Sequence, residues 1–147
     1  MKTFPSSIPL LLFLCLAIGC KKENIDLDSN IHHTIKTLLK AANCSAACGK
    51  KAACEGKIIH LKGRLDPSNI NAENKQFYLY DNSDKDYQME IQVWPSIAPE
   101  IFSLLEGQGG RTVRVAGILS GYDAATNLQC KRQFYMTLAS ASELSID

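Results

Sequence analysis

The stretch GRTVRVAGILSGY, residues 110–122, decides the fold class of this chain. Its side chains alternate between the two sides, as in a β-strand with one buried face. Gly117 lies inside the strand, where glycine is typical of a bulge or of the sharp bend of a barrel. Residues 134–144, FYMTLASASEL, are expected to form the next strand. This half of the chain therefore predicts strongly coiled β-structure.

Three shorter alternating segments precede this stretch and are also expected to be strands: residues 56–65, 76–81 and 86–94. The first contains another glycine, Gly63. A loop is expected over residues 66–74 and a turn over residues 82–85, because both are rich in turn formers. In the first of the three segments Ile59, Leu61, Gly63 and Leu65 alternate with Ile58, His60, Lys62 and Arg64. The expected inward side chains of the other two are Phe77, Leu79, Tyr87, Met89, Ile91 and Val93.

A short helix is expected between the third and fourth strands, within residues 95–110. Four apolar residues there share one helical face, Pro99 suits a first turn, and glycines from Gly107 onward end the helix. The four apolar residues are Ile97, Ile101, Leu104 and Leu105.

This element order, together with GRTVRVAGILSGY, resembles the OB-fold. The resemblance covers residues 55–144 and implies a mainly β fold, namely a five-stranded Greek-key barrel with a short helix between strands three and four. We assign residues 55–147 to this OB-fold-like domain. The alternatives are another small β-barrel or an α+β roll.

The first twenty residues, MKTFPSSIPLLLFLCLAIGC, have the basic start and short apolar run of an export signal. The ending Ala-Ile-Gly-Cys resembles the lipobox of bacterial lipoproteins. The resemblance implies a signal peptide at residues 1–19 and lipid, including palmitate, on Cys20, with residues 20–28 as a tether. The protein would then be anchored in a bacterial envelope membrane and face the periplasm or the cell surface. The alternative is an ordinary secretory signal that happens to end in a cysteine.

Residues 29–54 are expected to form a cysteine-containing helical segment. An apolar stripe at Ile31, Ile35, Leu38, Leu39 and Ala42 predicts an amphipathic helix. Asp28 or Ser29 is the expected cap of its first amides. His32 and His33 fall off the stripe and are expected to face solvent.

Four cysteines remain once Cys15 leaves with the signal peptide and Cys20 carries lipid: Cys44, Cys48, Cys54 and Cys130. An even number in an exported chain favours disulfides. Four cysteines allow three pairings, and the barrel order places Cys130 near the start of the first strand. The leading expectation is therefore a bond from Cys130 to Cys54 or to another cysteine of the cluster. A metal-handling or thiol-redox protein is the alternative function, although the chain lacks the paired C-x-x-C motifs typical of both.

The expected function is a non-catalytic binding module, because no sequence motif of a catalytic site occurs and no metal or other cofactor is expected. An OB-fold binds ligands across its second and third strands, whose outward side chains here include Tyr78, Tyr80 and Trp94. Arg114, on the fourth strand, is a further candidate. An alternative is that the N-terminal helix covers these aromatic side chains.

The expected partners are the membrane, through the lipid anchor, and a sugar, a peptide or a protein. Removal of Lys2 with the signal peptide leaves fifteen of the sixteen basic residues against fifteen acidic ones. The mature net charge is then near zero, and Glu90 lies in the middle of the aromatic face. Nucleic acid is therefore not expected as a partner, since such binders need a basic surface.

Overall fold

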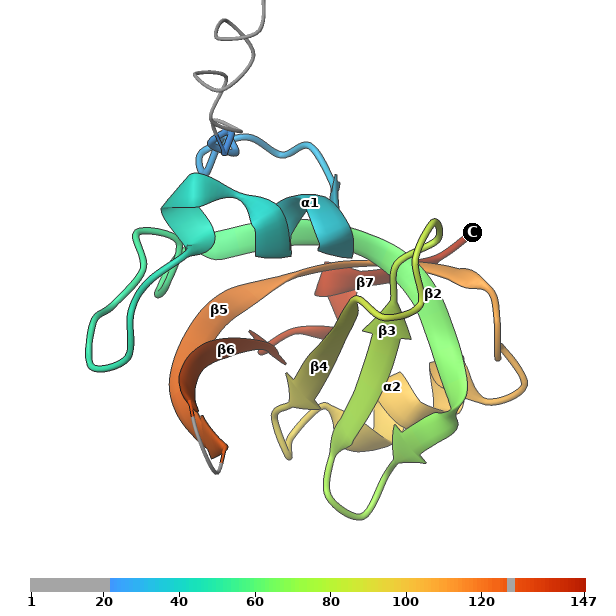
Figure 1. The fold of residues 1–147 in the computed structure, drawn as a ribbon. Helices are drawn as coiled ribbons and strands as arrows, with labels where there is room; N and C mark the ends of the chain where they lie inside the picture. The colour runs from blue at the N-terminus through green and yellow to red at the C-terminus, as the bar shows by residue number, and fades with distance from the viewer. Residues whose placement is uncertain (1–21, 127–128) are drawn as a thin grey trace, which may run out of the picture.

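Strands dominate the computed structural model, which describes residues 22–126 and 129–147 (Figure 1). Within these residues seven strands form one mixed sheet, with one helix near each end of it. The strands are β1 (His33–Thr34), β2 (Ile58–Asn71), β3 (Gln76–Tyr80), β4 (Gln88–Val93), β5 (Thr112–Thr126), β6 (Gln129–Leu138) and β7 (Leu144–Ile146). The helices are α1 (Ile35–Lys40) and α2 (Ala98–Leu105), with 3-10 turns at Ala42–Cys44 and Ala141–Glu143.

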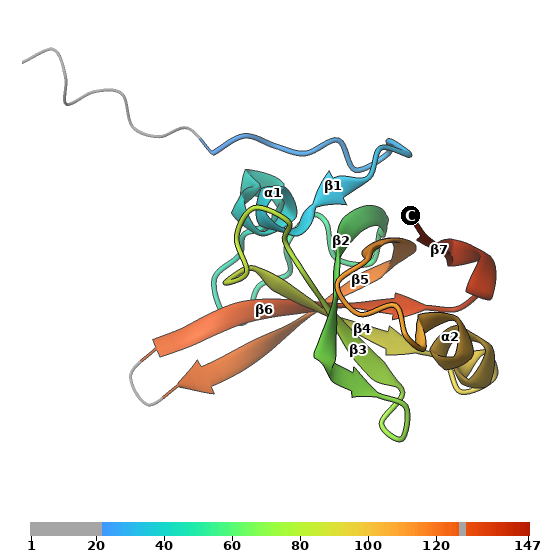
Figure 2. The same ribbon diagram turned by 90° about the vertical axis from the view of Figure 1, so that its right-hand side faces the viewer.

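The strand order is β1-β2-β3-β4-β6-β5-β7, and β2 also pairs with β5. Strands β2, β3, β4, β6 and β5 therefore pair in a ring that returns to β2. Strands β4 and β6 run parallel, whereas the other neighbours in the ring are antiparallel. Helices α1 and α2 lie at opposite ends of this ring of strands (Figures 1 and 2).

The core confirms the period-two alternation of the expected strands. The inward positions of β2, β3 and β4 are buried, and only Tyr87 among the expected set is half-buried. Val113, Val115, Leu119, Met136 and Leu138 add the matching positions of β5 and β6. The alternation in GRTVRVAGILSGY therefore does place one face of β5 in the core.

Two glycines allow close packing inside the sheet. A Cβ on Gly63 would lie 2.7 Å from Cδ1 of Ile35, and one on Gly117 would lie 2.6 Å from the carbonyl oxygen of Thr137. The backbone of β2 can thus contact the first residue of α1 directly. Gly63 is needed for space.

The expected loop over residues 66–74 is wrong in its first part, because β2 continues to Asn71. Its register against β3 shifts between Leu65 and Ile70, so the strand bends there. Asp66 accepts hydrogen bonds from Ser68 and Asn69 on the outer side of this bend. The turn-forming side chains therefore make their hydrogen bonds at this bend, and the strand continues beyond it.

The N-terminal helix is shorter than expected and begins later. Thr34, and neither Asp28 nor Ser29, caps α1, because its hydroxyl accepts a hydrogen bond from the amide of Thr37. Ile31 lies outside the helix and is 69% exposed, whereas Ile35 and Leu38 are fully buried.

The second helix, α2, lies within the expected residues 95–110. When β1 and β7 are counted, it follows the fourth of seven strands.

The expected tether packs against the domain from Glu23 onward. The carbonyl of Glu23 accepts a hydrogen bond from Ala42, and Ile25 is buried and exchanges two hydrogen bonds with the Asn43 side chain. Cys20 and the signal peptide lie outside the described residues. No helix among the described residues is long and apolar enough to cross a membrane.

Candidate ligand-binding face

Tyrosine side chains gather on the outer face of β3, β4, β6 and β5. Tyr78 of β3 pairs with Glu90 of β4, and Glu90 pairs in turn with Tyr135 of β6. The ring of Tyr122, from β5, lies 6.1 Å from that of Tyr135. We call Tyr78, Glu90, Gln92, Tyr122, Gln133 and Tyr135 the tyrosine face.

Hydrogen bonds fix the polar groups of the tyrosine face. The hydroxyl of Tyr78 donates to Oε2 of Glu90 over 2.8 Å, and the Gln92 amide donates to Oε1 over 2.9 Å. The hydroxyl of Tyr122 donates to Oε1 of Gln133 over 2.7 Å. Partial burial first, and then the hydrogen bond and charge of Glu90, raise the pKa of Tyr78 to about 12. The Tyr78 phenol therefore stays protonated across the neutral range.

Two expected binding residues belong to this side of the sheet. Tyr78 is part of the tyrosine face, and Tyr80 lies two residues further along β3, with the Lys85 ammonium 5.3 Å from its ring centre. Trp94 follows β4 and is 53% exposed. Tyr78 and Tyr80 alternate with the buried Phe77 and Leu79 along β3, so both lie on the outer face of that strand.

Arg114 lies elsewhere, near the start of β5 and opposite Lys62 of β2. Its guanidinium forms an ion pair with Asp147 at 2.8 Å. The structure thus separates this candidate from the tyrosines with which the sequence grouped it.

The N-terminal helix does not use its apolar stripe to cover the tyrosine face. Ile35 and Leu38 point into the core, with Ile35 beside Gly63. Tyr122, at 42% exposure, and the half-buried Tyr78 and Tyr135 remain accessible.

Sequence reasoning missed Tyr122 and Tyr135 as binding residues. The alternation along β5 and β6 could have placed both on the outward side. The parallel pairing that brings Tyr135 beside Glu90 joins strands far apart in the chain, and no local pattern indicates it.

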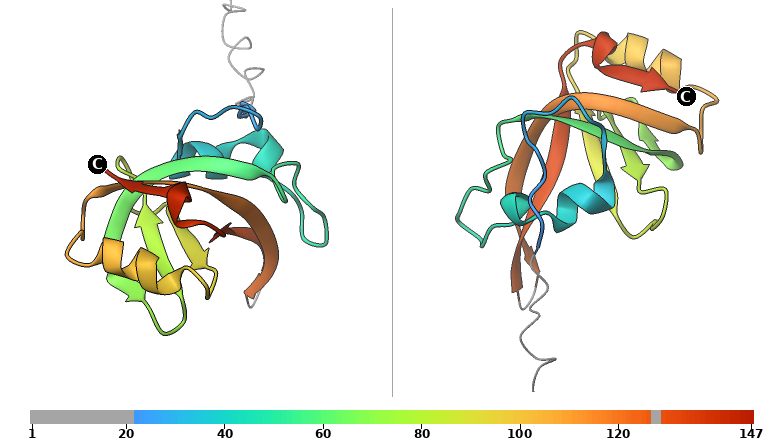
Figure 3. Two further views of the ribbon diagram at one scale, coloured as in Figure 1. Left: turned by 180° about the vertical axis from the view of Figure 1, so that it is seen from behind. Right: turned by 90° about the horizontal axis from the view of Figure 1, so that it is seen from above.

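The four cysteines form two disulfides, Cys44–Cys54 and Cys48–Cys130. The expected bond from Cys130 to the cysteine cluster is confirmed, and its partner is Cys48 and not Cys54, the first cysteine considered. The extended β5–β6 hairpin lies beside the Cys44–Cys54 segment, which is teal in Figure 3. The sulfur atoms of Cys48 and Cys130 also lie within 4.8 Å of an Asp123 oxygen. Because these sulfurs are bonded to each other, the cluster offers no thiolate to a metal.

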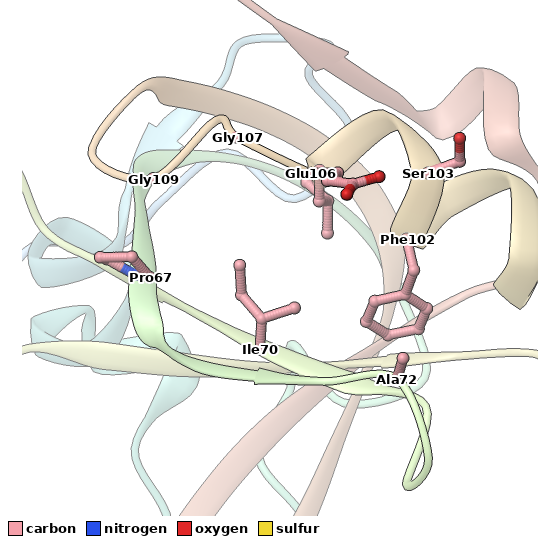
Figure 4. A pocket seen from close by; sticks show the side chains of 9 residues that line it. Pro67, Ile70, Ala72, Phe102, Ser103, Glu106, Gly107 and Gly109 are labelled. Atoms are coloured by element: carbon pink, nitrogen blue, oxygen red, sulfur yellow. The ribbon is translucent and has the colours of Figure 1, made fainter.

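A cavity of about 740 Å³ lies on another side of the molecule, between β2 and α2 (Figure 4). Pro67, Ile70 and Phe102 supply most of its apolar side-chain surface. Phe102 also packs edge-to-face against the core residue Phe77, with ring centres 6.4 Å apart. The cavity lacks the convergent polar groups that fix a small ligand.

No family model matches the chain, and no curated protein matches it in sequence. Among solved structures, the mitochondrial single-stranded DNA-binding protein of S. cerevisiae is 15% identical, with a TM-score of 0.45, 60% of this chain covered and 92% of that chain. A Plasmodium falciparum single-stranded DNA-binding protein in complex with single-stranded DNA is 20% identical, with a TM-score of 0.38 and coverages of 61% and 91%. A DUF3299 family protein from Pseudomonas aeruginosa is 11% identical, with a TM-score of 0.36 and coverages of 77% and 78%.

The first two of these structures are described as single-stranded DNA-binding proteins. This finding contradicts the expectation that nucleic acid is not a partner. The near-neutral net charge was too coarse a criterion, because it says nothing about a local binding face.

Proposed function

We propose that this protein is a lipid-anchored binding module of a bacterial cell envelope, in which the tyrosine face of an OB-fold barrel binds a glycan. The module binds its ligand without catalysis. The observation that carries the proposal is the gathering of three tyrosines from three strands around the hydrogen-bonded carboxylate of Glu90.

The ring of strand pairs supports the five-stranded barrel. The five ring strands can be numbered one to five along the chain, from β2 to β6. Their order around the ring is then one, two, three, five, four. This ring, with α2 between its third and fourth strands, supports a five-stranded Greek-key barrel. Strands β1 and β7 then become short additions, one on β2 and one on β5.

A glycan suits the chemistry of the tyrosine face. The apolar side of a pyranose packs on an aromatic ring, while its hydroxyls need closely placed acceptors and amides. Tyr122 and Tyr135 supply rings, and Glu90, Gln92 and Gln133 supply the polar groups. The central carboxylate favours neutral hydroxyl donors.

Binding to immobilised bacterial envelope polysaccharides tests the ligand class, with a peptide library and single-stranded DNA in parallel. We expect retention on a polysaccharide, and the double variant Tyr122→Ala/Tyr135→Ala should weaken it by about tenfold or more, since each stacked ring contributes roughly 1 kcal/mol. Ile31→Ala, at an exposed position outside the tyrosine face, serves as the control. Retention on DNA alone, lost in the same double variant, would keep the face and overturn the glycan.

The lipid anchor rests on the signal sequence and on Cys20. Lipid on this residue would hold the domain at a membrane, and two acyl chains are enough for stable anchoring. Mass measurement of the protein from a bacterial host tests this: we expect a mature chain that begins at Cys20 and carries acyl mass. Cys20→Ala should abolish the acyl mass, and an unmodified wild-type chain would overturn the anchor.

A further inference from the structure

A groove of about 570 Å³ lies next to the tyrosine face. One wall is the cysteine segment over residues 44–48, and the other comprises residues 86–88 at the start of β4 and residues 130–134 of β6. The Cys48–Cys130 disulfide joins the two walls at one end. The groove is therefore held in shape by a covalent bond.

The floor of the groove is apolar and its rim is mainly basic. Leu39, Tyr87 and Phe134 line it as half-buried side chains that pack against the core. The exposed Lys22 and Lys131 lie at the rim. The ammonium groups of Lys36 and Lys40 each lie 5.4 Å from the centre of the Tyr87 ring, so cations also flank the floor.

Acidic groups balance part of this charge and leave the rim cations available. Asp84 pairs with Lys36, while Glu55 and Asp123 pair with Arg132. Asp86 is the acidic residue that lines the groove itself. Among the residues that line the groove, Lys22 and Lys131 therefore outnumber Asp86.

The groove also lies where the chain enters the domain. Lys22 lines it, and Glu23 is fixed against Ala42 by a hydrogen bond of 2.9 Å. Cys20 precedes Lys22 by two positions in the sequence, and an extended chain spans at most about 3.6 Å per residue. The backbone of residue 20 can therefore be at most about 7 Å from that of Lys22, so a lipid there would hold the mouth of the groove close to the membrane surface.

We propose that the groove binds an anionic phospholipid of the membrane that holds the anchor. This inference rests on the proposed lipid anchor and adds a second ligand site to the proposed module. The phosphate contacts Lys22 and Lys131, and the first part of an acyl chain lies on Leu39, Tyr87 and Phe134. A basic rim over an apolar floor complements such an amphiphile in both charge and polarity. The bound lipid would fix the orientation of the domain on the membrane.

Native mass spectrometry of the full chain in a neutral detergent tests this, with added dioleoyl-phosphatidylglycerol or dioleoyl-phosphatidylcholine. We expect one bound phosphatidylglycerol at concentrations where phosphatidylcholine does not bind. Lys131→Glu should reduce the bound fraction by about fivefold or more, the effect of a single lysine at an anionic surface. Ala47→Trp should fill the groove and have a similar effect. The matched controls outside the groove are Lys57→Glu and Ala53→Trp, both at exposed positions.

Equal binding of the two lipids would overturn the site, and so would unchanged binding in both groove variants. The same spectra give the covalent mass of each chain, so the two proposals can fail separately. A chain without acyl mass that still binds phosphatidylglycerol in the groove would overturn the anchor and keep the site. An acylated chain that binds phosphatidylglycerol and phosphatidylcholine equally would keep the anchor and overturn the site.

Discussion

The Tyr78 hydroxyl donates a hydrogen bond of 2.8 Å to the Glu90 carboxylate, across the pairing of β3 and β4. The second oxygen of this carboxylate accepts from Gln92. Both oxygens are thus held in place before any ligand arrives, which lowers the entropy cost of binding. A ligand hydroxyl can use the remaining lone pairs without moving the side chain.

Tyr78 should be a late-titrating tyrosine. Burial and Glu90 raise its pKa to about 12, against about 10 for an unperturbed tyrosine. A raised pKa adds stability that is complete below the unfolded value and is lost as pH rises through the folded value. Ultraviolet titration of phenolate should show this step in the wild type, and Tyr78→Phe should remove it.

Glu90→Gln tests the cause of this shift. The variant should lower the pKa of Tyr78 by removing the negative charge but should not restore the ordinary value, because burial is the larger cause. An unchanged titration in Glu90→Gln would contradict the contact. Lys57→Glu, a charge change at an exposed site, is the control.

Arg132 should stabilise the β5–β6 hairpin through Glu55. Its guanidinium lies 2.6 Å from Glu55 and 2.9 Å from Asp123, and the side chains of Arg132 and Glu55 are 14% and 5% exposed. Arg132→Ala should leave the buried carboxylate of Glu55 without its cation and raise the unfolding equilibrium constant by about tenfold or more. Urea denaturation measures this change.

The matched double variant Arg132→Leu/Glu55→Leu should be more stable than Arg132→Ala, because it leaves no unpaired charge.

The ion pair also predicts acid sensitivity. The Arg132 hydrogen bonds lower the pKa of Glu55 against the opposing effect of burial. A lowered pKa gives stability above the unfolded value, which is lost as pH falls through the folded value. Equal stability of Arg132→Ala and Arg132→Leu/Glu55→Leu would contradict the role of Arg132 as the cation that neutralises Glu55.

Asp81 should hold α1 on the β3–β4 turn. Its buried carboxylate accepts hydrogen bonds from the Lys36 amide and from Ser83. Burial raises its pKa, but these hydrogen bonds outweigh burial and bring the pKa down to about 2. The stability it supplies should therefore be lost as pH falls from about 4 to about 2.

Asp81→Asn should lower the free energy of unfolding at pH 7 by roughly 1–3 kcal/mol, since an amide is a weaker acceptor than a carboxylate. It should also flatten the acid limb of the stability curve. Urea titrations at several pH values measure both effects, with Asp28→Asn at an exposed site as the control. An acid limb that is unchanged in Asp81→Asn would exclude this carboxylate as its source.

The strands were predictable where the chain alternates, because burial of one face imposes a period of two on the sequence. This holds for β3 and β4 and for the start of β2. It fails at Asp66 and Pro67, where turn-forming residues lie at a bend that the pairing with β3 carries through. The start of the helix was not predictable from the apolar stripe either. Ile31 has the helical spacing of the stripe, but α1 begins only after its cap, Thr34.

The candidate site was predictable only within one hairpin. Tyr78 and Glu90 are neighbours in a local pairing, so their shared face follows from alternation. Tyr135 reaches the same face through the parallel pairing of β4 with β6, which depends on the whole chain path. The cysteine pairs have the same origin, since the length of the β5–β6 hairpin sets which cysteine lies near Cys130.

The two disulfides should differ in their access to reductant. Cys130 is exposed and Cys48 half-buried, whereas Cys44 and Cys54 are 1% and 0% exposed. Thiol exchange requires attack on a sulfur that the reductant can reach. Low concentrations of dithiothreitol followed by alkylation should therefore label Cys48 and Cys130 first, as peptide mass mapping can show. Simultaneous labelling of all four cysteines would contradict this order.

Removal of each disulfide should also lower the free energy of unfolding by a different amount. Cys48–Cys130 joins residues 82 apart and Cys44–Cys54 residues 10 apart. In the chain-entropy model these crosslinks contribute about 4–5 and about 3 kcal/mol. Cys48→Ser/Cys130→Ser should therefore lose more stability from chain entropy, and it should also release the groove wall. Cys44→Ser/Cys54→Ser carries a further cost, because it places two hydroxyls in the core. Phosphatidylglycerol binding separates the two cases, since a fixed groove requires the Cys48–Cys130 bond and should lose the lipid when that bond is removed.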